Sequence, residues 1–150
     1  MFPTRRGLQP PLSVIQQLAQ LLSHTERHIT RELARILEAD GFAIEQWRAI
    51  ALLADGNPHS MSEIAEHALA SAPSLTRTVD RMVADNLVYR TADPSDRRRV
   101  LVHISPRGQA RHRQIADHIE AEQEAIMAEA DPEHLAALAA LLTELLARMR

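Results

Sequence analysis

The sequence predicts a mainly α-helical chain of the α+β kind, in which six helices accompany a small β-sheet of two or three strands. Apolar residues recur at spacings of three, four and seven along most of the chain, which is typical of amphipathic helices. Residues 88–104 differ, because two β-branched runs flank the turn-forming residues Asp93-Pro94-Ser95-Asp96. A chain of 150 residues without cysteine is long enough for one core and has no disulfides, so we treat residues 1–150 as a single domain.

Two helices are predicted before residue 55. Residues 1–11 contain three prolines and a glycine and should form an extended arm. The first helix is predicted from Leu12 to about Ala39 and should end at Asp40-Gly41. It is long for a small core, which suggests that a second subunit covers part of it. The second helix is predicted over Glu45–Ala54, before the turn-forming residues 55–58.

The next two helices are short and closely spaced. Ser60 and Glu63 have the spacing of a capping box, which predicts a helix from Met61 to about Leu69. Ser71 is the predicted N-cap of a helix that runs to about Asp85. That helix should bury Leu75, Val79 and Met82, and its polar face carries Ser74, Thr76, Arg77, Asp80 and Arg81. Two short helices with a tight turn are typical of a helix-turn-helix.

A β-hairpin and two further helices complete the prediction. The hairpin strands are Val88–Thr91 and Val100–Ile104, with Arg97, Arg98 and Arg99 at or just after its turn. Ser105-Pro106 should begin a helix that reaches about Ala128, and Asp131-Pro132-Glu133 should begin the last one. The last helix carries an apolar stripe, which we expect a second copy of the chain to cover; packing against the chain's own first helix is the alternative, and both can hold together. The stripe comprises Leu135, Leu138, Leu141, Leu142, Leu145, Leu146 and Met149.

Positive charge is concentrated in the middle of the chain. The net charge is −3 and every basic residue is arginine, but nine arginines and only four acids lie between Arg77 and Arg113. A cationic hairpin directly after a helix-turn-helix predicts a winged helix-turn-helix. In that arrangement one helix enters the major groove of DNA and the wing reaches the backbone or the minor groove. The sequence therefore predicts a protein that binds double-stranded DNA.

The same segments resemble the MarR (multiple antibiotic resistance regulator) family of winged helix-turn-helix transcriptional regulators. The resemblance is strongest in Thr-Arg-Thr-Val-Asp-Arg-Met (76–82), Asp-Pro-Ser-Asp-Arg-Arg-Arg (93–99) and Val-His-Ile-Ser-Pro-Arg-Gly (102–108). It is weaker in residues 46–50 and 62–65. The resemblance implies a repressor that binds a pseudo-palindromic operator as an obligate homodimer. Residues 1–40 and 106–150 would form the dimerisation helices, and residues 41–105 the DNA-binding lobe.

The resemblance also implies which residues contact DNA. Ser71, Ser74, Thr76 and Arg77 would face the major groove or its phosphates, and Arg97 or Arg98 would reach the minor groove. Arg81 and Arg99 are further candidates, although Asp80, Arg81 and Asp96 should act mainly as structural residues. Arginine suits these contacts because it binds guanine bidentately and is attracted to a narrow minor groove. Ala43 stands where the family often has a threonine-type cap, so the second helix is expected to fray at its start.

A small aromatic or amphipathic effector is the other partner that the resemblance implies. It would bind in a cleft lined by the first, second and fifth helices, where the candidate residues are His24, His28, Trp47, Arg48 and His118. A place in the core is the stronger explanation for Trp47, and a structural link between helices is the stronger one for Arg48. His24 and His28 share a helix face, but a pair is too few ligands for a tight site, so we assign neither a metal nor a cofactor.

The sequence gives less support to two other classes of function. The winged fold could serve as a protein-interaction module, but such a module has no need of three arginines at the wing tip. An enzyme is not predicted, because we find no nucleophile–base arrangement, no phosphate-binding glycine loop and no metal motif. The sequence also has no signal peptide and no apolar run long enough to cross a membrane, so we expect a cytoplasmic protein.

Overall fold

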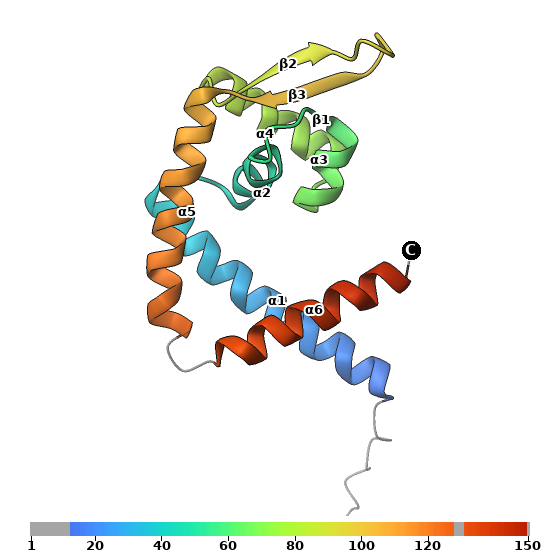
Figure 1. Cartoon of the computed structure of the whole chain (residues 1–150), viewed down its shortest axis with the longest axis vertical. Coiled ribbons are helices and arrows are strands. Elements are labelled where there is room, and N and C mark those ends of the chain that lie inside the picture. The colour runs from blue at the N-terminus through green and yellow to red at the C-terminus, as the bar shows by residue number, and fades with distance from the viewer. Residues whose placement is uncertain (1–12, 128–130, 150) are drawn as a thin grey trace, which may run out of the picture.

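The computed structural model describes residues 13–127 and 131–149, which form six helices and a three-stranded sheet (Figure 1). Every predicted helix and both hairpin strands are present. The ends of these elements differ from the predicted ends by at most one residue wherever the predicted residue is described. The predicted arm over residues 1–11, the predicted helix start at Leu12 and the predicted helix end at Ala128 lie outside the described residues. The elements are α1 (Val14–Ala39), α2 (Ile44–Leu53), β1 (His59–Ser60), α3 (Met61–Ala68), α4 (Ala72–Ala84), β2 (Val88–Ala92), β3 (Val100–Ile104), α5 (Pro106–Met127) and α6 (Pro132–Arg148).

The helix starts follow the predicted caps. The Ser60 hydroxyl accepts a hydrogen bond from Glu63 N at 3.3 Å, and Glu63 Oε2 accepts one from Ser60 N at 2.7 Å, so the capping box of α3 is complete. The Ser71 hydroxyl accepts from Ser74 N at the start of α4. The expected fraying of α2 does not occur. Ala43 has no capping side chain, but Gln46 Oε1 accepts from Ala43 N at 2.9 Å, and the helix begins one residue earlier than predicted.

The sheet is antiparallel, with strand order β1-β3-β2. The hairpin pairs Val88 with Ile104 and Ala92 with Val100, and this register turns Val88 and Val102 toward the core. Strand β1 adds His59 opposite Val102. Two residues are too few to show an alternating pattern, so the sequence alone left open whether the wing has two or three strands.

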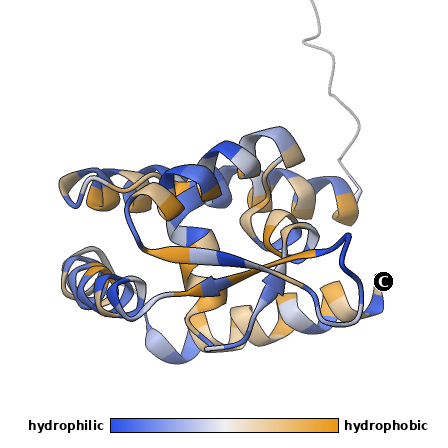
Figure 2. Ribbon diagram, turned by 90° about the horizontal axis from the view of Figure 1, so that it is seen from above, coloured by the Kyte–Doolittle hydropathy of each residue, from blue (hydrophilic) through white to orange (hydrophobic). Residues whose placement is uncertain are grey.

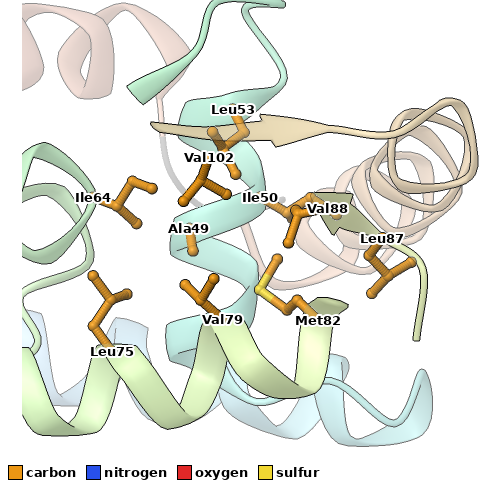
Figure 3. Packing of buried hydrophobic residues seen from close by; sticks show 10 residues of the cluster. All are labelled: Ala49, Ile50, Leu53, Ile64, Leu75, Val79, Met82, Leu87, Val88 and Val102. Carbon is orange, nitrogen blue, oxygen red and sulfur yellow. The ribbon is translucent and has the colours of Figure 1, made fainter. Parts of the chain in front are cut away.

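The helix-turn-helix and the wing share one hydrophobic core, which Figure 3 shows from close by. Helices α2, α3 and α4 and the two hairpin strands all contribute side chains, so the wing is packed against the helix that precedes it. The core residues are Ala49, Ile50, Leu53, Ile64, Leu75, Val79, Met82, Leu87, Val88 and Val102. The predicted apolar face of α4, Leu75, Val79 and Met82, is therefore buried as expected.

A second cluster joins the end of α1 to the middle of α5 through Ile36, Leu37, Ile115 and Ile119. Beyond this cluster α1 extends away from the lobe, and α6 lies apart from the lobe, with its C-terminal end directed back toward it (Figure 1); none of the described α6 residues is buried. Figure 2 shows hydrophobic segments interrupted by hydrophilic ones along the strands, and a hydrophilic loop between the strands. No helix among the described residues is long and apolar enough to span a bilayer.

Candidate nucleic-acid interface

Helix α4 is the predicted recognition helix, and its polar face is exposed. Ser71, Ser74, Thr76, Arg77 and Arg81 are all exposed on it, as the sequence predicts. The Thr76 hydroxyl donates to the Ala72 carbonyl at 2.9 Å, so it is already used within the helix. Arg77 and Arg81 make no side-chain hydrogen bond or ion pair within the described part of the chain. Their guanidinium groups are therefore available to an anionic partner, and no side-chain contact among the described residues supports the mainly structural role expected for Arg81.

Asp80 on the same face has a different role. Its Oδ1 accepts a hydrogen bond from Arg90 Nη1 at 2.7 Å, which connects α4 to strand β2. This agrees with the structural role expected for Asp80, although nothing in the sequence singles out Arg90 as its partner. The pair also neutralises a carboxylate that would otherwise repel DNA.

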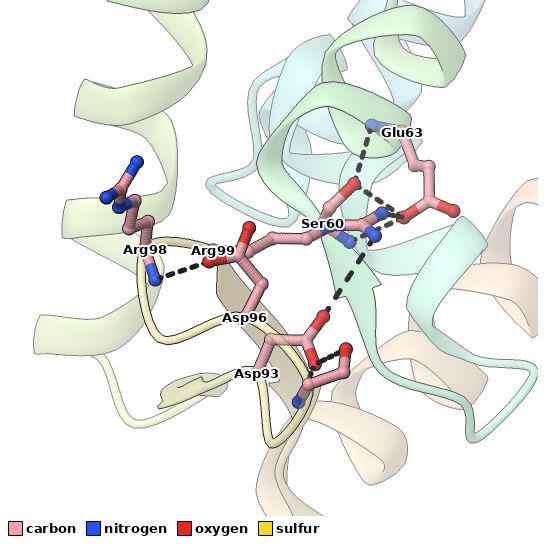
Figure 4. A network of polar contacts seen from close by, with 7 residues as sticks. Ser60, Glu63, Asp93, Asp96, Arg98 and Arg99 are labelled. Carbon is pink, nitrogen blue, oxygen red and sulfur yellow. Dashed lines mark hydrogen bonds and ion pairs between the residues drawn. The ribbon is translucent and has the colours of Figure 1, made fainter.

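The wing turn is held by its own carboxylates (Figure 4). Asp93 accepts hydrogen bonds from the amide and the hydroxyl of Ser95, at 2.8 and 2.6 Å. These bonds hold the pKa of the Asp93 carboxyl below its usual value, with a smaller contribution from the charge of Arg99. Asp96 accepts from the backbone N–H of Arg98 at 3.0 Å. Asp96 therefore orders the turn through the backbone, in agreement with its expected structural role.

The three wing arginines are not equivalent. Arg99 Nη2 lies 3.5 Å from Glu63 Oε2 on α3, and its Nη1 lies 4.0 Å from Asp93 Oδ2. Hydrogen bonds from Ser60, and then the charge of Arg99, keep the pKa of Glu63 below its usual value. Figure 4 shows Arg99 turned toward Ser60 and Glu63, and Arg98 turned away from them. These contacts favour a structural role for Arg99, as a link between the wing and the helix-turn-helix.

Arg97 and Arg98 are exposed, and neither side chain has a hydrogen bond or an ion pair within the described part of the chain. The structure thus separates two unpaired guanidinium groups at the wing tip from one that is anchored. The sequence could not make this distinction, because the acid that anchors Arg99 lies 36 residues away.

The outer face of the wing carries an arrangement that sequence reasoning missed. The rings of Tyr89 and His103 stack at 4.8 Å between centroids, with 6° between their planes. His103 Nε2 also lies 2.8 Å from the Thr91 hydroxyl. The cross-strand register, which pairs Tyr89 with His103, is the signal that could have found this contact.

The predicted effector residues fall into three separate arrangements. His24 and His28 are exposed on α1 and line a shallow hollow with Thr25 and Ile29. His118 contacts Asp40, with 2.6 Å between Nδ1 and Oδ2. Among the described residues, no group of three or more histidine, cysteine, aspartate or glutamate side chains could hold a metal ion.

Trp47 and Arg48 form the third arrangement, on α2. Trp47 stacks on His112 of α5 at 5.1 Å and 9°. Burial lowers the pKa of His112, and its Nδ1 is buried without a hydrogen-bond partner. Arg48 donates to the Thr30 hydroxyl at 3.4 Å and to the Ala68 carbonyl at 3.5 Å. Arg48 therefore links α1 to the end of α3, which agrees with the structural alternative given for it.

Comparison with known proteins matches the lobe and the whole fold. The model of the MarR family matches residues 42–100. The chain is 30% identical to the HTH-type transcriptional regulator FarR of Neisseria gonorrhoeae over 110 residues, which cover 73% of this chain and 75% of FarR. It is 31% identical to the HTH-type transcriptional repressor IacR of Pseudomonas putida over 87 residues, which cover 58% of this chain but only 52% of IacR.

Among solved structures, the fold of the chain is similar to the crystal structure of NadR in complex with 4-hydroxyphenylacetate. The TM-score is 0.76 at 26% identity, and the match covers 93% of this chain and 96% of NadR. The similarity extends over the helices outside the lobe as well as over the lobe itself.

Proposed function

The chain belongs to the MarR family of winged helix-turn-helix transcriptional regulators, and from this premise we propose that it is a repressor that binds a pseudo-palindromic DNA operator as a homodimer. One observation carries the proposal. The recognition helix and the wing tip each present guanidinium groups with no partner in the described chain, while their neighbours Asp80 and Arg99 are held in ion pairs.

The proposed contacts divide between the two elements. Arg77, with Ser71, Ser74 and Thr76 around it, enters the major groove, and Arg77 reads a base. Arg81 contacts the adjacent backbone. Arg97 and Arg98 reach the minor groove or the phosphates beside it. Arg99 acts through the wing, which it holds against α3.

Dimerisation through the terminal helices is supported by apolar surface that the described residues leave uncovered. Val14 and Ile15 on α1 are 80% and 79% exposed, and Leu141 and Leu146 on α6 are 64% and 63% exposed. We therefore assign residues 1–40 and 106–150 to the dimer interface and residues 41–105 to the DNA-binding lobe. A dimer makes the second half-site contact intramolecular, which raises affinity without new kinds of contact.

A small aromatic or amphipathic effector completes the proposal. It would bind beside the Trp47–His112 stack, where a buried imidazole nitrogen has no partner and where α1, α2 and α5 meet. NadR, a structural relative, was solved with 4-hydroxyphenylacetate. As a DNA-bound regulator, the protein would act in the bacterial cytoplasm.

The test uses the operator selected from a random DNA pool by the intact protein. Replacing Arg97 and Arg98 together by alanine should weaken binding strongly, and should flatten the log–log salt dependence by about 0.9 for each lost phosphate contact. The matched control is Arg113→Ala on α5, which is also exposed and unpaired among the described residues.

Arg77→Ala distinguishes base reading from phosphate binding. If Arg77 reads guanine, the variant should lose about 1–3 kcal/mol at the selected operator and relax the preference at one position in each half-site. Unchanged affinity in both the wing variant and the Arg77 variant would refute the proposed interface.

A further inference from the structure

A hollow of about 560 Å³ lies on the side of α5 that faces two turns of the chain. The loop between α1 and α2 contributes Asp40 and Phe42 to it, and the turn between α4 and β2 contributes Asp85 and Leu87. Helix α5 contributes Arg107, Ala110, Arg111 and Gln114, which have the spacing of one helix face. The volume is in the range of small-molecule sites, about 300–1,000 Å³.

One charged pair in this hollow is already neutralised. Arg111 Nη1 lies 3.5 Å from Asp40 Oδ1, Nη2 donates to the Asp40 carbonyl, and the guanidinium lies over the Phe42 ring at 5.6 Å. Arg111 Nη1 also donates to Gln114 Oε1 at 2.9 Å. His118 approaches the second Asp40 oxygen. These contacts fix Arg111 in place and leave Asp40 compensated.

The other two charged residues have no partner among the described residues. Arg107 and Asp85 both line the hollow, are exposed, and make no side-chain hydrogen bond or ion pair within the described chain, either with each other or with another residue. The hollow therefore presents one unsatisfied cation and one unsatisfied carboxylate. Half-buried Phe42 and exposed Ala110 add apolar surface beside these charges, whereas Leu87 is a core residue that reaches the hollow only at its edge.

We propose that this hollow binds a small zwitterion with an apolar side chain, of the α-amino acid class. The ligand carboxylate pairs with Arg107, supported by the positive field of Arg111, and the ligand ammonium pairs with Asp85. The apolar side chain lies on Phe42 and Ala110. A plain anion fits less well, because it would gain Arg107 but lie beside the uncompensated Asp85 carboxylate.

The position of the hollow gives the ligand a route to regulation, a step that rests on the proposed function. Asp85 follows directly after the recognition helix α4. Arg107 belongs to α5, the helix that packs against α1 in the second cluster. A ligand that bridges Asp85 and Arg107 connects the end of α4 to α5. It changes DNA affinity to the extent that it binds the DNA-competent arrangement differently from the free one.

Binding is tested first without DNA, so that failure of this proposal is distinguishable from failure of the proposed function. The probes are L-leucine and L-phenylalanine, each compared with its N-acetyl derivative, which lacks the ammonium, and with its amide, which lacks the carboxylate. Amide chemical shifts of residues 85–87 and 107–114 and isothermal titration of the full chain are the measurements.

The expected result is that at least one amino acid shifts these resonances and that both derivatives bind about tenfold or more weakly. Arg107→Gln and Asp85→Asn should each weaken binding to a similar extent, and Arg113→Gln should leave it unchanged. Three results would overturn the proposal: no binding of any probe, as when Arg107 and Asp85 simply pair in solution; equal binding of the derivatives; or binding unaffected by both substitutions.

Discussion

Gly108→Ala is the substitution whose effect the structure predicts most sharply, because we expect it to destabilise the fold where alanine normally stabilises a helix. Alanine in place of glycine normally stabilises a helix interior by about 0.5–1 kcal/mol. Gly108 is buried in the first turn of α5, where the backbone of Leu87 crosses it. A Cβ on residue 108 would lie 2.9 Å from Ile104 Cγ1, 3.0 Å from the Leu87 carbonyl carbon, and closer still to the carbonyl oxygen.

The cost follows from what has to move. The nearest neighbour is backbone, which cannot rotate away, so we take the overpacking cost of about 1–3 kcal/mol. Displacing the Leu87 carbonyl also weakens its 2.9 Å hydrogen bond from Ser105 N, worth about 1 kcal/mol. The weakened hydrogen bond roughly cancels the stabilisation that alanine brings to the helix. The overpacking cost remains, so the variant should be destabilised by about 1–3 kcal/mol.

The assay is urea unfolding followed by circular dichroism at one fixed protein concentration, because dimerisation would make stability depend on concentration. Gly56→Ala is the control: Gly56 has a φ of +83°, and a Cβ added there would meet no atom within 4 Å, so the substitution adds only backbone strain. Gly108→Ala should also weaken operator binding, since Leu87 leads into the wing, whereas Gly56→Ala should not. A Gly108→Ala protein as stable as the wild type would refute the reasoning.

Three further predictions concern the wing anchor, the buried histidine and the terminal helix. Glu63→Gln and Arg99→Gln should show a coupling of about 0.2–1 kcal/mol in a double-mutant cycle of unfolding, and each should weaken operator binding; additive effects would contradict the anchor. Because burial lowers the pKa of His112, the stability of the fold should decrease as the pH drops below about 6.5, and His112→Phe should remove that part of the decrease. Unfolding followed by the fluorescence of Trp47, the single tryptophan, measures the stability at each pH. Identical pH profiles of the variant and the wild type would contradict the prediction. Ending the chain after Ala130 should abolish the dimer in sedimentation, and a shortened chain that remained dimeric and bound its operator normally would place the interface elsewhere.

Local sequence signals account for most of the fold. Capping residues such as Ser60 and Ser71 act within three or four positions, and the apolar spacing of a helix repeats within a turn, so both are readable along the chain. The predicted fraying of α2 was wrong because it rested on the short side chain of Ala43 alone. Gln46, three positions later, supplies the other half of the capping arrangement. The β1 strand is defined only by its pairing with β3, which no local pattern reveals.

The candidate interface was predictable in its outline but not in the division of roles among its residues. Three consecutive arginines look identical in sequence, yet Arg99 is committed to Glu63 from another helix, and Arg97 and Arg98 have no partner among the described residues. Similarly, Asp80 is directed to Arg90 by the packing of α4 on β2. Charge counting locates a DNA-binding region because field strength depends on the sum of charges. Assigning each guanidinium a role depends on which acids the tertiary fold brings within about 4 Å, and acids that lie tens of residues apart in the chain are found only when the helices are packed together.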